Sequence, residues 1–171
     1  MLNSIVFWLT IKPRMALLQR QFPEVRIYPA GSRYVCSPPV ISTDVDFLVY
    51  TKKSIDQKLE AIGFKKSQSE NYRKTEDHDD FWAWRRREVN LIVTSSANYA
   101  ETFDTATHIC KRFNVRDKWE RICLHEALRK GVNTHRVHNG EVYELVGSLI
   151  GPYGVPLRKA YRAQHNLELI S

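Results

Sequence analysis

Residues 30–50 read AGSRYVCSPPVISTDVDFLVY, and this stretch decides the expected fold. Polar and apolar residues alternate over residues 43–50, which predicts a half-buried β-strand with Asp44 and Asp46 on one face. The preceding segment, residues 24–32, alternates in the same way before a proline and a glycine end it. Two strands joined by a polar loop are therefore expected here, with both aspartates at the start of the second strand.

Outside this stretch, strands and helices mix without strict β-α-β alternation. Helical spacing of apolar residues and the β-branched and aromatic runs mark the individual elements. We expect helices over residues 13–21, 54–62, 99–113, 116–127 and 157–164, strands over 80–86 and 88–94, two short strands within VHNGEVYELV (137–146), and a loop at GPYGVP (151–156). This order predicts an α+β fold with a mixed β-sheet flanked by helices.

Composition narrows the class of protein. The chain has 171 residues, enough for one domain over 1–171, and its net charge of +7 favours a polyanionic partner such as nucleic acid. The 3 cysteines form no CxxC pair and no even set, which is typical of a reducing cytoplasm. The apolar run near the start is too short for a membrane span, so no membrane partner is expected. The oligomeric state stays open.

The two aspartates are candidates for metal binding. Residues two apart on a strand point the same way, with side chains about 7 Å apart at their base. Such carboxylates are hard oxygen ligands that suit Mg²⁺ or Mn²⁺. Gly31 lets the backbone approach a ligand closely, and Ser32 and Arg33 beside it offer donors for phosphate.

Gly31-Ser32, 11 intervening residues, and Asp44-x-Asp46 followed by the apolar FLVY together resemble the signature of the DNA polymerase β-like nucleotidyltransferase superfamily. The resemblance covers residues 24–95 and is closest to small stand-alone members, including those of bacteriophages. It implies a nucleotidyltransferase fold, with the motif region followed by a helical part over residues 97–171. It also implies transfer of a nucleotidyl group from an NTP to a hydroxyl acceptor, with Mg²⁺ held by the aspartates, in the host cytoplasm for a phage protein. The basic charge favours RNA, including tRNA, as the acceptor.

One position departs from that pattern. The third carboxylate of the family falls in the stretch EVNLIVTSS, where this chain has Asn90. A neutral amide can ligate through its oxygen but cannot act as a general base. Three interpretations remain open: Asn90 still contacts metal or substrate and solvent takes the proton, Glu88 supplies the missing carboxylate, or the protein is a non-catalytic module that binds nucleic acid or a partner protein.

Several basic and aromatic residues are further candidates. The resemblance implies that basic residues on the later helices contact the triphosphate, and Lys118 is the first candidate among Lys111, Arg116, Lys118 and Arg121. Trp82 and Trp84 share a strand face beside three arginines and could stack on bases. A groove for a nucleic-acid acceptor could also include Arg14, Arg158, Lys159 and Arg162.

Overall fold

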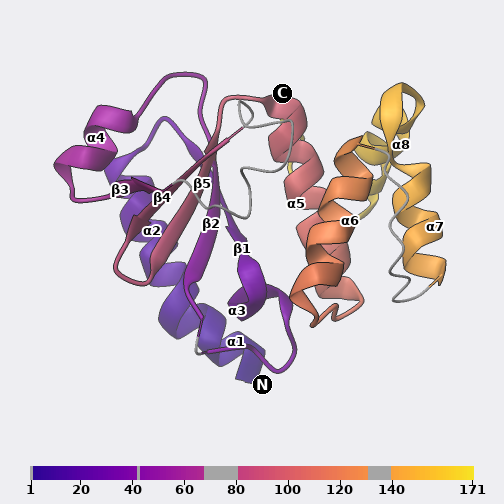
Figure 1. Cartoon of the computed structure of the whole chain (residues 1–171), viewed down its shortest axis with the longest axis horizontal. Helices are drawn as coiled ribbons and strands as arrows, with labels where there is room; N and C mark the ends of the chain where they lie inside the picture. The colour runs from indigo at the N-terminus through magenta and orange to yellow at the C-terminus, as the bar shows by residue number, and fades with distance from the viewer. Residues whose placement is uncertain (1, 42, 68–80, 131–139) are drawn as a thin grey trace.

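The computed structural model describes residues 2–41, 43–67, 81–130 and 140–171. Within these residues a mixed β-sheet has the strand order β1-β2-β5-β4-β3 (Figure 1). Its strands are β1 (Arg26–Ala30), β2 (Val45–Tyr50), β3 (Lys65–Ser67), β4 (Trp82–Arg86) and β5 (Val89–Thr94). β2 and β5 run parallel, and the other neighbouring pairs are antiparallel. The α+β class with a mixed sheet flanked by helices is confirmed.

N-terminal helices cover one face of the sheet. α1 (Leu2–Val6), the π-helix η1 (Phe7–Ile11) and α2 (Lys12–Gln21) follow one another without a break, so the helix expected from residue 13 begins eleven residues earlier. With α4 (Asp56–Ala61) they bury the odd-numbered face of β2, where Phe47 is fully enclosed. Burial of such a side chain stabilises the fold by about 1.5–3 kcal/mol.

α5 (Ala97–Arg112) covers the opposite face of the sheet. Leu48 and Tyr50 of β2 pack there with Tyr99 and Ala100 of the helix. The expectation of a half-buried strand is therefore wrong beyond Asp46, because β2 is a central strand covered on both sides. Only the first residues of β2 lie at the end of the sheet where the strand begins, and polar side chains are tolerated there.

The C-terminal third is helical. α6 (Lys118–Lys130), α7 (Gly140–Ser148) and α8 (Gly151–Gln164) pack beyond α5 (Figure 1). The expected second strand of VHNGEVYELV is wrong, since Val142 and Val146 lie four residues apart and bury one face of α7. The expected loop at 151–156 is also wrong, because α8 begins at Gly151 with Pro152 in its first turn, where a proline loses no hydrogen bond, and the helix continues through Pro156. The residues 137–139 of that prediction lie outside the described part of the chain.

Exposure of the apolar side chains differs from the sequence pattern at two helices. In α6 the buried face consists of Leu124, Ala127 and Leu128, while Trp119 is exposed. In α1 and η1, Val6 and Ile11 enter the core, whereas the apolar residues Trp8 and Leu9 are exposed. In the described part of the chain, none of the helices is long and apolar enough to cross a membrane.

Candidate functional site

A row of side chains crosses the sheet at the start of β2. Strand pairing sets Ala30 of β1 opposite Asp46, Asp46 opposite Asn90 of β5, and Asn90 opposite Arg85 of β4. β2 and β5 are parallel, so the beginnings of both strands meet at the same edge of the sheet. The topology thus brings together residues that are 44 positions apart in the chain.

Asp46 is enclosed from two sides. Its Oδ1 accepts a hydrogen bond of 2.8 Å from the Asn90 amide nitrogen. Its Oδ2 lies against Gly31, where an added Cβ would stand only 1.9 Å from that oxygen. Gly31 also has φ +74°, a conformation that L side chains rarely adopt. Glycine is therefore required at this turn both by the backbone and by the carboxylate.

Asp44 faces the solvent side of the same edge. Its Oδ2 lies 2.8 Å from Nη2 of Arg85, and the two side chains remain 36% and 55% exposed. An ion pair so open to water contributes little to stability, because solvent competes with both charges. The charge of the Asp44 carboxylate is thus balanced by Arg85, whose exposed side chain can move away from it.

The electrostatics of this edge favour an added cation. Burial raises the pKa of Asp46, and the nearby charge of Asp44 acts in the same direction. The hydrogen bond from Asn90 and the charges of Arg85 and Lys118 oppose that rise without cancelling it. Burial therefore leaves the charged form of this carboxylate poorly solvated, and a bound cation would stabilise that form.

The donor set fits one hard divalent ion. Asp44 and Asp46 offer carboxylate oxygens, the ligands that Mg²⁺ and Mn²⁺ prefer, and Mg²⁺ commonly takes one or two carboxylates with water and substrate phosphates. No group of three or more His, Cys, Asp or Glu suited to a metal occurs among the described residues. The two aspartates fit an ion completed by substrate, but a set of three carboxylates is absent from the described residues.

Ser32 and Arg33 lie in the short helix α3 (Gly31–Val35) and face the loop before β2. The Ser32 hydroxyl lies 3.0 Å from the hydroxyl of Thr43. The Arg33 guanidinium donates to the backbone carbonyls of Ile41 and Thr43. Both side chains therefore brace the loop that delivers Asp44 and Asp46, and the phosphate contact expected of them stays a prediction.

The four basic candidates for phosphate contact separate into two groups. Arg121 is bound to the carbonyls of Val115 and Arg116, and Arg116 donates to the carbonyl of Pro38. Lys111 stands 3.4 Å from the ring centroid of Tyr34. Lys118, in contrast, is exposed at the start of α6, and its charge reaches Asp46. Among the described residues, its ammonium has no hydrogen-bond or ion-pair partner.

Glu88 is unsuited to replace the third carboxylate. It lies in the turn before β5, and its Oε1 is 2.6 Å from Nη2 of Arg14 on α2. That hydrogen bond lowers the pKa of Glu88, which weakens it as a proton acceptor. Glu88 is therefore an exposed turn acid whose carboxylate is paired with Arg14.

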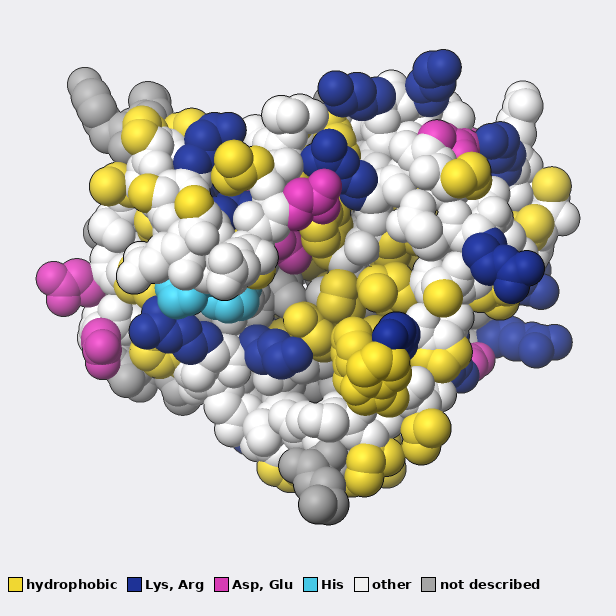
Figure 2. Space-filling model, turned by 180° about the vertical axis from the view of Figure 1, so that it is seen from behind, with side chains coloured by type: hydrophobic (Ala, Val, Ile, Leu, Met, Phe, Trp, Pro, Cys, Tyr) yellow, Lys and Arg dark blue, Asp and Glu magenta, His cyan; other side chains and the backbone are white. Residues whose placement is uncertain are grey.

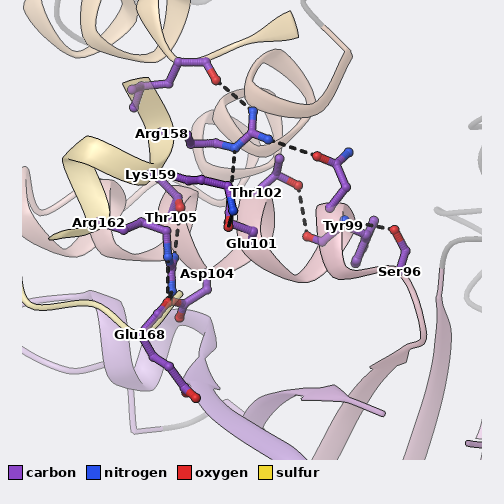
Figure 3. A network of polar contacts seen from close by, with 12 residues as sticks. Ser96, Tyr99, Glu101, Thr102, Asp104, Thr105, Arg158, Lys159, Arg162 and Glu168 are labelled. Carbon is purple, nitrogen blue, oxygen red and sulfur yellow. Dashed lines mark hydrogen bonds and ion pairs between the residues drawn. The ribbon is translucent and has the colours of Figure 1, made fainter. Parts of the chain in front are cut away.

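Most of the aromatic and arginine candidates for nucleic-acid contact are buried or already contact other side chains of the protein. Trp84 is fully buried, and the partly exposed Trp82 is covered by the Lys66 ammonium at 3.9 Å from its ring. Figure 3 shows Arg158 and Arg162 turned from α8 toward acidic residues of α5. Both arginines are at most 3% exposed, so neither can line a groove.

Those two arginines anchor α8 to α5. Nε of Arg158 lies 3.2 Å from the Glu101 carboxylate, and Nη2 of Arg162 lies 2.8 Å from that of Asp104. Arg162 also donates to the hydroxyl of Thr105 (Figure 3). On the face seen in Figure 2, basic side chains are spread among apolar and acidic ones without forming a continuous stripe. Part of the positive charge of the protein, that of Arg158 and Arg162, therefore stabilises the packing of α8 on α5.

Arg85 is the site residue that the sequence reading did not single out. The two-residue turn of Arg87 and Glu88 joins β4 to β5 and sets Arg85 opposite Asn90. Counting back from that turn along RRREVN would have placed Arg85 beside the expected third carboxylate position.

Comparisons with known proteins give no relative: no protein-family profile matches the chain, and the searches of curated proteins and of solved structures find no significant match.

Proposed function

We propose that this protein transfers a nucleotidyl group from an NTP to a hydroxyl acceptor with the help of Mg²⁺ or Mn²⁺. The observation that carries the proposal is the contact between the turn at Gly31 and the carboxylate of Asp46, with Asp44 at the same edge of the sheet. A ligand at this edge would meet backbone, two carboxylates and the charge of Lys118 together. The resemblance of residues 24–95 to polymerase β-like nucleotidyltransferases supports the same activity and fold.

In this proposal each residue of the site has a separate role. Asp44 and Asp46 would hold the ion, which when bound neutralises phosphate charge and activates oxygen ligands. Lys118 would attract the phosphates of the incoming NTP. Asn90 keeps the Asp46 carboxylate in place through its hydrogen bond, and its amide cannot take the proton of the acceptor hydroxyl. That proton would pass to solvent, so positioning and charge would supply most of the rate enhancement.

RNA is the proposed acceptor. The net charge of +7 attracts polyanions at long range. The exposed Arg87 lies in the turn at the edge where Val45 donates its backbone N–H to the carbonyl of Glu88. A phosphate backbone following this edge would bring its terminal hydroxyl near Asp44.

Label transfer tests the activity. The protein is incubated with each α-³²P NTP in turn, total RNA, and Mg²⁺ or Mn²⁺. Transfer is expected in the wild type and is expected to vanish in the double variant Asp44→Asn with Asp46→Asn. Asp56→Asn is the matched control, because this partly exposed aspartate lies on α4 at the opposite face of the sheet and pairs with Lys66. Absence of transfer with every NTP and both metals would refute the proposal.

A second candidate is a non-catalytic module that binds nucleic acid. The observation that favours it is the pairing of Asp46 with Asn90 and of Asp44 with Arg85, which satisfies both carboxylates with protein groups. Such a protein would bind RNA equally well in the wild type and in the double aspartate variant, with no dependence on divalent ions. Gel-shift titration of both proteins, with and without EDTA, separates the two candidates.

A further inference from the structure

We propose that Arg85 is a tethered counter-ion that competes with the divalent cation for Asp44 and so sets the metal concentration at which the site loads. This inference rests on the proposed function in one respect, since it takes Asp44 and Asp46 as the metal ligands. It adds a regulatory residue that neither the motif nor the resemblance supplies.

Strand geometry aims Arg85 at the site. Residue 85 lies opposite Asn90, and Asn90 lies opposite Asp46, so the three side chains leave the same face of the sheet. From β4 the guanidinium reaches past Asn90 to Asp44, where Nη2 lies 2.8 Å from Oδ2. Its charge also acts on Asp46, where it opposes the rise in pKa caused chiefly by burial. Arg85 thus occupies the position of positive charge that a bound cation would take.

The ion pair between Arg85 and Asp44 can be replaced by other contacts. Both side chains of the ion pair are more than one third exposed, so water can replace either partner at little cost. A divalent ion brings twice the charge of a guanidinium and can bind both aspartates together. An ion entering between them would have to displace Arg85 or accept its repulsion at close range. Either event lowers the affinity for the metal compared with a site that lacks this arginine.

The next residue in the strand provides a matched control. Arg86 carries the same charge but belongs to the opposite face of β4, and its Nε lies 3.6 Å from the Cβ position of Gly63. Replacement of either arginine by glutamine changes the net charge by the same amount. A difference in metal affinity between the two variants therefore depends on where the charge lies and not on the net charge of the protein.

Binding of Mn²⁺ alone, without nucleotide, tests the inference. Free Mn²⁺ is followed by electron paramagnetic resonance in titrations of the wild type, Arg85→Gln and Arg86→Gln, each checked for folding by circular dichroism. A unit charge about 5 Å from a divalent ion at a solvent-exposed site predicts roughly tenfold tighter binding in Arg85→Gln. Arg86→Gln is expected to bind within about twofold of the wild type, because its more distant charge is screened.

The Asp44→Asn background completes the design. The gain from Arg85→Gln should be smaller there, since the competition for that carboxylate is removed and only the repulsion between Arg85 and an ion at Asp46 remains. Equal affinity of the wild type and Arg85→Gln overturns the inference while leaving the proposed metal role intact. Equal gains in Arg85→Gln and Arg86→Gln also overturn it, because they would reflect net charge alone. Absence of Mn²⁺ binding in all these proteins overturns the inference together with the metal role of the aspartates.

Discussion

Replacing Gly31 with alanine should destabilise the protein far more than a turn glycine ordinarily would. The left-handed backbone at φ +74° costs an L side chain about 1–2 kcal/mol. The added Cβ would also overlap Asp46 at 1.9 Å from Oδ2 and 2.8 Å from its Cβ, so the strand or the turn must shift. Overpacking of this kind costs a further 1–3 kcal/mol or so, which gives about 2–5 kcal/mol in total.

Gly63→Ala is the control for the backbone contribution. Gly63 has φ +90°, but its Cβ position lies 3.6 Å from the nearest atom, the Arg86 Nε, which is an ordinary contact. We expect this variant to lose only about 1–2 kcal/mol. Urea unfolding followed by circular dichroism yields the free energy of unfolding for both variants. Equal losses for Gly31→Ala and Gly63→Ala would refute the close contact between the turn and Asp46.

Three further predictions concern buried charge. Asn90→Asp should lose the hydrogen bond to Asp46 and place like charges together, lowering the free energy of unfolding by about 1–3 kcal/mol, with recovery on addition of Mg²⁺ in urea titrations. Burial raises the pKa of Asp46, so the folded state holds this proton more tightly and stability falls as pH rises through the folded pKa. Asp46→Asn should therefore be more stable than the wild type at pH 7 and show no advantage below pH 3.8, as compared by urea midpoints at both values. Arg162→Met leaves the Asp104 carboxylate, which is only 14% exposed, without its partner and should cost about 3 kcal/mol, measured by thermal unfolding against the exposed control Leu157→Ala.

Local patterns were sufficient for the part of the chain that forms the sheet. Alternation over residues 43–50 predicted β2, and the two runs after residue 80 predicted β4 and β5 within two residues. The helix expected over residues 54–62 is followed by Gly63, which has a positive φ and donates its backbone N–H to the carbonyl of Glu60. β3 was missed because its three residues carry too little pattern, and its pairing with β4 defines it.

Long-range contacts decided what the sequence did not predict. Asn-Gly and Gly-Pro pairs are turn signals, yet α7 and α8 form there because Val142, Val146 and Tyr161 join a core with α5 and α6. The charges of Arg158 and Arg162 were read as solvent-facing, but their acidic partners lie 57 and 58 positions earlier in the chain. In the site, the spacing of Asp44 and Asp46 predicted a shared strand face, whereas Gly31 and Asn90 were singled out by the resemblance to a known family. The roles of Ser32, Arg33 and Arg85 required the loop and strand register.

The polar row from Ala30 through Asp46 and Asn90 to Arg85 has a consequence for how the sheet assembles. If β2 paired one residue out of step, its alternating side chains would change sides, and Asp46 would enter the apolar cluster around Phe47. An unpaired carboxylate in such surroundings is expensive, so mispaired chains would be unstable before the helices could close over them. The charged residues that we assign to chemistry would in this way also act as an alignment mark during folding, and replacing all of them at once should let the two central strands slip.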